Sequence, residues 1–118
     1  MKAKSGGLIE PQLTVVVPIY NEELTLPDVL PPLVKLCSQQ NYRLLLINDG
    51  SKDKTSNILD SYRKTPGIVI LQHKINRGYG SALKTGIMQT ETPFLITFDG
   101  DGQHDPADIT KILEFALE

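Results

Sequence analysis

The side chains best suited to chemistry lie in the stretch FDGDGQHDP, at positions 98–106. Three aspartates, a glutamine and a histidine follow an apolar run there. Carboxylates this close repel each other, and a divalent cation such as Mg²⁺ or Mn²⁺ relieves the repulsion while it also binds substrate phosphate oxygens. The pattern therefore favours a metal site that includes Asp99 and Asp101. The imidazole of His104 suits an oxygen-preferring ion poorly.

Two other interpretations of this stretch are weaker. An EF-hand counted from Asp99 needs glycine at its sixth position and glutamate at its twelfth, where the chain has His104 and Thr110. In a purely structural loop, Asp105 would cap the helix that follows, but Asp99 and Asp101 would still be crowded together.

A glycine-rich stretch, NRGYGSALKTG at positions 76–86, offers a second kind of site. It is neither a dinucleotide-binding loop nor a P-loop, because Leu83 stands where each of them needs a glycine. A glycine-rich loop that leads into a helix still suits an anion such as a diphosphate, and Arg77 could add charge. Glycines that allow a tight turn and close helix packing explain the stretch equally well.

The third candidate is Asp49, at the end of an apolar run. The residues after it indicate a turn, with Ser51 or Asp53 capping the next helix. That interpretation explains Gly50 and Ser51 but gives Asp49 no role. A carboxylate in this place can accept hydrogen bonds from a ribose or a base, so a binding role is favoured.

The elements that must position these residues alternate along the chain. Short apolar runs with the near-continuous character of buried parallel strands cover 13–20, 42–48, 68–72 and 94–98. Helix-compatible segments cover 25–40, 53–64 and 78–90, and a last one begins near Pro106. The order predicts a three-layer, Rossmann-like α/β fold with a parallel sheet and helices on both faces. Pro31 and Pro32 predict an irregular first turn, with a regular helix from about Pro31.

The candidate residues all follow strand ends. In an open parallel sheet, ligands bind beyond the carboxyl ends of the strands, where residues 20–23, 48–51, 73–80 and 99–105 would meet. Residues 20–23 and 99–103 reach one ligand only if the first and fourth strands are neighbours. The predicted spatial order is therefore 3-2-1-4.

The composition sets broader limits. The 118 residues suit one domain, with residues 1–12 as a flexible arm and 13–118 as the folded unit. The net charge of −2 gives no general attraction to nucleic acid, and no apolar run is long enough to cross a bilayer. The single cysteine, Cys37, excludes an intrachain disulfide and indicates a packed thiol in a cytosolic protein. Since the sequence stops inside an amphipathic segment, we expect it to be the first part of something longer.

Together, four stretches resemble the family 2 glycosyltransferases and their A-type nucleotide-sugar-binding fold. They are VVVPIYNEE at 15–23, LLINDGSKDKT at 45–55, NRGYGSALKTG at 76–86 and FDGDGQHDP at 98–106. The DGDGQH segment resembles the branch of dolichyl-phosphate mannose synthase and the bacterial polyprenyl-phosphate glycosyltransferases. The resemblance spans about residues 13–118.

The resemblance assigns roles to particular residues. Asp99 and Asp101 match the D-x-D motif, which binds the donor through Mg²⁺ or Mn²⁺, and Gln103 is implied as a further metal ligand. Asp49 would contact the base. Gly100 stands where this branch often has alanine, a small change. The nucleotide-sugar-binding residues expected in all are Pro18, Tyr20, Glu22, Asp49, Gly78, Lys84 and Asp99.

The activity implied is metal-dependent transfer of a sugar, with inversion, from a nucleotide diphosphate to a polyprenyl phosphate or another glycan or lipid acceptor. A lipid phosphate is already a nucleophile, and any general base would lie beyond Glu118. The expected location is the cytoplasm, or the cytoplasmic face of a membrane for a longer parent protein.

Two other functions and one side effect complete the expectations. The chain alone could bind nucleotide and metal without turnover. A dehydrogenase-like dinucleotide domain is disfavoured, because the first apolar run ends in PIYNEE and not in a glycine loop. The strand at 94–98 would form an apolar sheet edge, so we also expect self-association.

Overall fold

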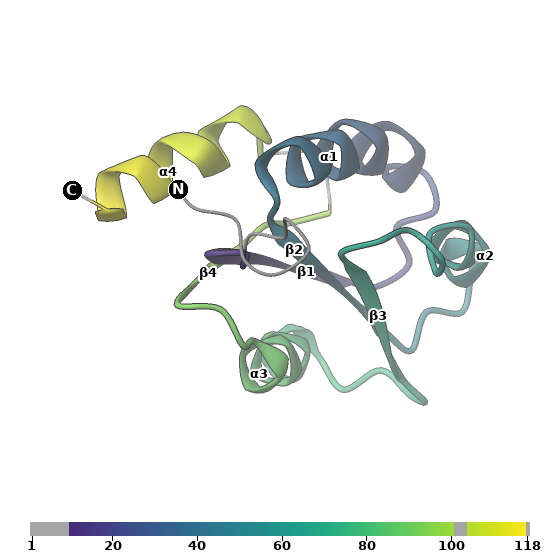
Figure 1. Cartoon of the computed structure of the whole chain (residues 1–118). Helices are drawn as coiled ribbons and strands as arrows, with labels where there is room; N and C mark the ends of the chain where they lie inside the picture. The colour runs from purple at the N-terminus through teal and green to yellow at the C-terminus, as the bar shows by residue number, and fades with distance from the viewer. Residues whose placement is uncertain (1–9, 101–103, 118) are drawn as a thin grey trace.

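The computed structural model describes residues 10–100 and 104–117, in which strands and helices alternate as predicted (Figure 1). The elements are β1 (Leu13–Ile19), α1 (Leu26–Gln40), β2 (Arg43–Asp49), α2 (Thr55–Asp60), β3 (Ile68–His73), α3 (Tyr79–Gln89), β4 (Phe94–Thr97) and α4 (Ala107–Leu117). No helix in this described part is both long enough and apolar enough to cross a membrane.

The sheet is parallel, and its spatial order is β3-β2-β1-β4, which confirms the predicted topology. The chain first builds outward from β1 to β2 and β3, and then returns to place β4 on the other side of β1. The sheet thus has a switch point between β1 and β4, the usual place for a ligand in an open α/β sheet. The register pairs Asp49 at the end of β2 with His73 at the end of β3.

Helices cover the two faces of the sheet unequally (Figure 1). One face carries the larger core, to which α1, α2 and α4 contribute Leu30, Leu59 and Ile109. Of the described helices, α3 alone lies on the other face, where Ala82 packs on β1 and β2. The outer strands consequently alternate between covered and open positions, and Leu95 of β4 is 38% exposed. The prediction of full cover on both faces holds for β1 and β2 and is wrong for β3 and β4.

Helix α1 begins earlier than the sequence predicted. It runs unbroken from Leu26 with Pro31 and Pro32 inside it, so the predicted irregular turn is wrong. Both proline rings are exposed, whereas the stripe through Leu30 and Leu33 is fully buried against the sheet. Burial of that stripe outweighs the backbone hydrogen bonds that the two prolines cannot make. Cys37 lies in the same stripe, and burial raises the pKa of its thiol to about 12, which confirms a packed thiol.

The other helices agree with the prediction to within a turn or two. Helix α2 is shorter than the predicted 53–64, because after Asp60 the backbone continues with i→i−3 bonds and the Ser61 hydroxyl donates to the Ile58 carbonyl. At α4, a carboxylate oxygen of Asp105 accepts a hydrogen bond from the N–H of Ala107 (2.9 Å), as expected of a cap.

Candidate functional site

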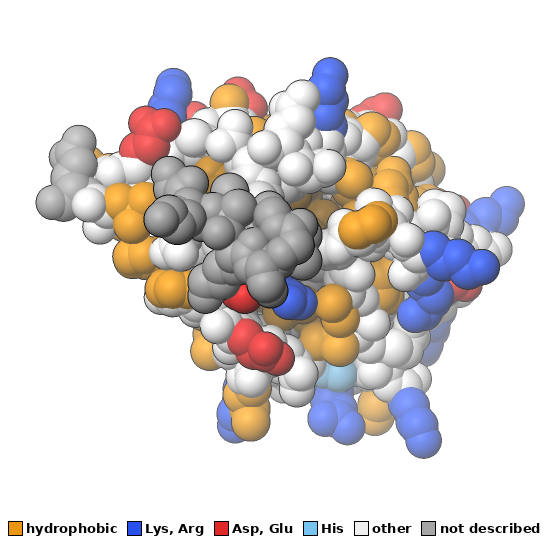
Figure 2. Space-filling model, viewed as in Figure 1, with side chains coloured by type: hydrophobic (Ala, Val, Ile, Leu, Met, Phe, Trp, Pro, Cys, Tyr) orange, Lys and Arg blue, Asp and Glu red, His pale blue; other side chains and the backbone are white. Residues whose placement is uncertain are grey.

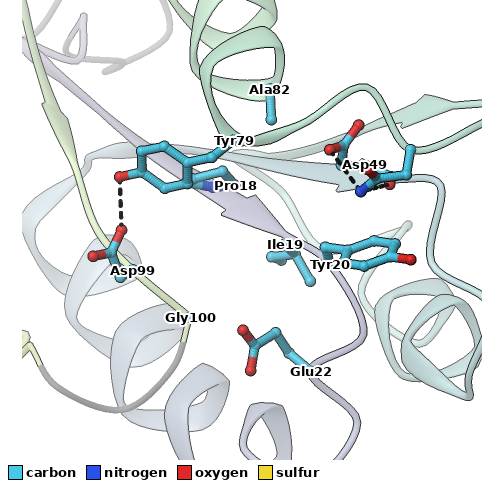
Figure 3. A pocket seen from close by; sticks show the side chains of 10 residues that line it. Pro18, Ile19, Tyr20, Glu22, Asp49, Tyr79, Ala82, Asp99 and Gly100 are labelled. Atoms are coloured by element: carbon cyan, nitrogen blue, oxygen red, sulfur yellow. Dashed lines mark hydrogen bonds between the residues drawn. The ribbon is translucent and has the colours of Figure 1, made fainter.

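A cavity of about 280 Å³ opens at the carboxyl edge of the sheet (Figure 3). It lies between the ends of β1, β2 and β4 and the start of α3, at the switch point of the sheet. Five of the predicted site residues line it, namely Pro18, Tyr20, Glu22, Asp49 and Asp99. The other lining residues are Ile19, Asn76, Tyr79, Ala82 and Gly100.

Asp49 stands at one end of the cavity and is only 2% exposed. Its Oδ1 accepts hydrogen bonds from His73 Nδ1 (2.7 Å) and from the N–H of Arg77 (3.0 Å). Its Oδ2 accepts from the N–H of Gly78 (2.9 Å) and from the Asn76 side-chain amide (3.2 Å). Burial alone would raise the pKa of Asp49, but the hydrogen bonds from Arg77, His73 and Gly78 outweigh it and lower that pKa. The carboxylate therefore holds the loop at 76–78.

His73 is a functional candidate that the sequence reasoning missed. Its ring is buried between Asp49 and α3, and its Nε2 lies 2.8 Å from the hydroxyl of Thr85. The available signal was its place at the end of the third apolar run, where a parallel register sets it beside Asp49. That register is not visible in either segment alone.

Glycines allow two close approaches near the cavity: between the loops that follow β2 and β3, and between α3 and β1. Gly50 has a φ of +70°, and a Cβ there would overlap the backbone of Ile75 and Asn76. Gly86 packs α3 closely on β1, because a Cβ at this position would overlap the Val16 side chain. The tight-turn and close-packing explanation of the glycine-rich stretch therefore accounts for Gly86.

Two predicted binding residues do not line the cavity. The N–H of Gly78, at the start of α3, donates to Asp49, so it is already used within the protein. Lys84 lies further along α3 with an exposed side chain. Contact of either residue with a ligand stays a prediction.

The loop after β1 is fastened to the loop after β2, which sets the position of Tyr20 and Glu22. Asn21 has a left-handed φ of 50°; its N–H donates to Ser51 Oγ (3.0 Å), and its Oδ1 accepts from the N–H of Lys52 (2.8 Å). The N–H of Glu22 donates to Thr55 Oγ1 (2.9 Å). Together these bonds hold the two loops in one arrangement.

Asp53 supports the same arrangement. Its carboxylate accepts from the N–H of Thr55 (2.9 Å) at the start of α2 and from the N–H of Glu23 (3.3 Å). Burial alone would raise its pKa, but hydrogen bonds from Thr55 and Glu23 lower it overall. The N-cap position of α2 is Lys54, so neither predicted residue occupies it; Asp53, one residue earlier, accepts from the first helical N–H, whereas Ser51 bonds the neighbouring loop.

Asp99 lies across the cavity from Asp49 (Figure 3). Its Oδ1 accepts from the hydroxyl of Tyr79 (3.0 Å), a contact that the sequence did not indicate. Its side chain is 34% exposed, and its Oδ2 is 3.7 Å from His104 Nε2. The N–H of Asp99 donates to His104 Nδ1 (3.2 Å), and the imidazole packs edge-on against Phe98. His104, which precedes α4, thus contacts the two residues that follow β4.

The described part of the predicted metal site is one carboxylate, that of Asp99. Asp101 and Gln103 lie outside the described residues, and within the described ranges no group of three His, Cys, Asp or Glu side chains is arranged to hold an ion. The Asp99 carboxylate faces the cavity, and such an oxygen ligand suits Mg²⁺ or Mn²⁺. A Cβ at Gly100 would meet Leu26 at an ordinary 3.5 Å, so the alanine of similar proteins would fit.

The Thr25 hydroxyl connects the loop after β4 to the loop after β1. It lies 2.8 Å from Glu22 Oε2 and 2.9 Å from the Gly100 carbonyl oxygen, and it donates its single hydrogen to either acceptor. Thr25 precedes α1 but makes no side-chain cap. Its hydroxyl instead joins the loops after β1 and β4, one on each side of the switch point.

A sequence profile described as glycosyl transferase family 2 matches residues 14–118. The chain belongs to this family. It is 34% identical over 116 residues to the undecaprenyl-phosphate 4-deoxy-4-formamido-L-arabinose transferase of Serratia proteamaculans, covering 93% of this chain and 36% of that enzyme. The chain thus spans about a third of the length of this curated relative.

Solved structures agree on the fold. S. aureus TarS 1–349 in complex with UDP-GlcNAc superimposes with a TM-score of 0.75 at 24% identity, covering 88% of this chain and 30% of that one. The mannosyltransferase PcManGT from Pyrobaculum calidifontis, in complex with GDP-Man and Mn²⁺, gives 0.68 at 21% identity, covering 79% and 28%. The sheet and its helices are therefore the Rossmann-like part of the glycosyltransferase A-type fold.

Proposed function

We propose that this chain is the donor-binding part of a glycosyltransferase that moves a sugar from a nucleotide diphosphate to a polyprenyl phosphate or a related glycan or lipid acceptor. The observation that carries the proposal is the cavity at the switch point, where Asp49 and Asp99 face one space from either side of β1. The undecaprenyl-phosphate transferase and the UDP-GlcNAc complex support this choice of acceptor and donor.

The nucleoside belongs at the Asp49 end. Tyr20 presents an aromatic ring at the cavity wall on the Asp49 side, whereas Glu22 lies toward Gly100 and Pro18 lies between the two ends (Figure 3). Asp49 already accepts two hydrogen bonds on each oxygen. A base N–H would therefore replace one of them, and the bond from Asn76 is the longest of the four.

The diphosphate belongs at the Asp99 end, where Asp99, Asp101 and Gln103 would hold Mg²⁺ or Mn²⁺. When bound, the ion supplies positive charge that stabilises the departing diphosphate. The acceptor phosphate oxygen attacks the anomeric carbon from the face opposite the leaving group, which inverts the configuration. Its own negative charge makes a protein base unnecessary. A lipid acceptor would place the reaction in the cytoplasm at a membrane surface.

A second candidate is binding of nucleotide and metal without turnover by these 118 residues alone. It is favoured by the length of the chain relative to its relatives and by the location of all five cavity-lining candidates on the donor side. A transferase assay with several nucleotide sugars and a polyprenyl phosphate separates the two candidates, since multiple turnover excludes the second.

Calorimetric titration of UDP and GDP, with and without Mn²⁺, tests donor binding. We expect Mn²⁺ to tighten nucleotide binding by about tenfold or more, because a charge-assisted contact contributes roughly 1.5–3 kcal/mol. Asp101→Ala should abolish this gain. Asp105→Ala is the matched control, because it removes a nearby carboxylate that accepts a hydrogen bond from the N–H of Ala107 at the start of α4. Equal affinity with and without Mn²⁺, in chains with native circular dichroism, would refute the metal assignment.

A further inference from the structure

His73 uses both of its ring nitrogens inside the protein. It ends β3 opposite Asp49, is 8% exposed, and lies 2.7 Å from Asp49 Oδ1 and 2.8 Å from Thr85 Oγ1. An ionised carboxylate can only accept hydrogen bonds, so Nδ1 must carry a hydrogen. In the neutral ring, Nε2 then accepts from the Thr85 hydroxyl. The ring is thereby fixed between two strands and α3.

The carboxylate that His73 holds is also the anchor of the loop at 76–78. Two successive backbone N–H groups, those of Arg77 and Gly78, donate to its two oxygens at 3.0 and 2.9 Å. Both bonds form only when the carboxylate is turned to one particular angle about its Cβ–Cγ bond. The hydrogen bond from His73 to Oδ1 favours that same angle. Without that bond, the other hydrogen bonds that the carboxylate accepts from described residues come from the loop itself, so the loop loses its fixed reference in the sheet.

The anchored loop forms part of the cavity wall. Asn76 and Tyr79 line the cavity, and they stand directly on either side of the two anchored N–H groups. The Tyr79 hydroxyl then donates to Asp99 at the opposite end (3.0 Å). An unbroken series of hydrogen bonds and chain links thus runs from Thr85 through His73 and Asp49 to Asp99.

We propose that His73 is a positioning residue for donor binding: by orienting Asp49 it keeps the loop at 76–78 in the shape that receives the nucleotide. This inference rests on the proposed function for the identity of the ligand. The positioning itself is a property of the free protein, so it is measurable without any ligand.

Two substitutions separate the hydrogen bond from the space that the ring fills. His73→Asn keeps an N–H donor bonded to Cγ, as Nδ1 is, and so can still bond Asp49. His73→Leu keeps apolar volume but has no donor. We expect the leucine variant to bind UDP or GDP in the presence of Mn²⁺ about tenfold or more weakly than the wild type, because it leaves a charged acceptor short of a partner. The asparagine variant should stay within about threefold.

Amide hydrogen exchange at Arg77 and Gly78, measured without nucleotide, gives the independent readout. Both amides should exchange faster in His73→Leu and stay protected in His73→Asn. Thr14→Val is the matched control: it breaks a partly buried hydrogen bond to Thr92 (2.7 Å) at the far end of β1 and should change neither affinity nor the exchange of these two amides. If His73→Leu does not fold, Thr85→Val removes the outer partner alone and should shift both readouts in the same direction.

The outcomes are distinct. Unchanged exchange at Arg77 and Gly78 in the leucine variant would overturn the positioning role, as would equal losses in the leucine and asparagine variants. A wild-type chain that binds neither nucleotide would overturn the proposed function and the donor-binding part of this inference, while the exchange data would still decide whether His73 holds the loop.

Discussion

The two ends of the cavity are built differently. Asp49 is buried, and both its oxygens are occupied by donors from β3, the following loop and the start of α3. Asp99 is one-third exposed, and among the described residues it receives one short side-chain bond, from the hydroxyl of the exposed Tyr79. One carboxylate is a buried part of the scaffold, and the other is partly exposed at the cavity.

This difference indicates that one end of the cavity is ordered before a ligand binds, to a greater degree than the other. Groups that are already oriented before a ligand arrives lose little freedom when it binds. The Asp49 end is organised in this way by the protein itself. Under the proposed function, the Asp99 end would be organised by a bound ion or diphosphate, so a substitution at Asp49 should mainly lower stability and one at Asp99 should mainly weaken binding.

The largest effect is expected from Asp49→Ala. Its removal leaves a buried imidazole and two backbone N–H groups without their acceptor, so the free energy of unfolding should fall by about 3 kcal/mol. Asp99→Ala should change it by less than about 0.5 kcal/mol, because its partners can bond water instead. Urea unfolding followed by circular dichroism measures both. Similar losses for the two variants would remove the distinction between the ends.

Alanine substitutions at the glycines that follow these two aspartates should also differ in their cost to stability. Gly50→Ala puts a Cβ at positive φ and against the backbone of Ile75 and Asn76, and we expect a loss of about 2 kcal/mol or more. Gly100→Ala places its Cβ at ordinary contact distance from Leu26 and should stay within about 0.5 kcal/mol. Thermal unfolding of the pair is sufficient, and a tolerated alanine at position 50 would contradict the observed approach of the loops.

Acid should lower the free energy of unfolding in part through protonation of Asp49. The pKa of Asp49 is lower in the folded chain than its usual value, so below about pH 4 the unfolded chain binds more protons and stability falls with pH. The contribution is fully present above that range and is lost as pH falls through the folded pKa. Unfolding free energies between pH 6 and pH 3 should fall less steeply in Asp49→Asn. Asp53→Asn is the necessary comparison, since the pKa of Asp53 is lowered too.

The smallest expected effect is weak self-association away from the cavity. Within the described residues no strand pairs with the outer edge of β4, and hydrophobic side chains gather at the α4 end of the molecule (Figure 2). Phe115 is 78% exposed there. Light scattering over a dilution series should show association that Phe115→Glu reduces and that Leu24→Glu, at an exposed position outside β4 and α4, does not. A monomer at every concentration would contradict this expectation.

Much of the fold could be predicted from local patterns. Apolar runs of strand length, separated by helical spacing, predicted the elements, and the shared chemistry of the loops after the first and fourth strands predicted their adjacency. The errors came where burial competes with local preference. Pro31 and Pro32 disfavour a helix locally, yet the packed stripe on the other side of α1 keeps the helix intact. The open faces of β3 and β4 depend on where a single helix, α3, comes to lie.

The sequence by itself determined which side chains stand at strand ends, because a residue that follows an apolar run in a parallel sheet must reach the carboxyl edge. That was enough to place Tyr20, Glu22, Asp49 and Asp99 at the edge where the cavity lies, whereas Pro18, inside β1, was expected only from the family resemblance. Only the tertiary structure decided what Asp49 and Asp99 do for the protein itself. The partners of Asp49 come from residues 24 to 29 positions away, through the register of β2 with β3 and the course of one loop. Hydrogen bonds of this kind follow from distances in space, which no spacing along the chain specifies.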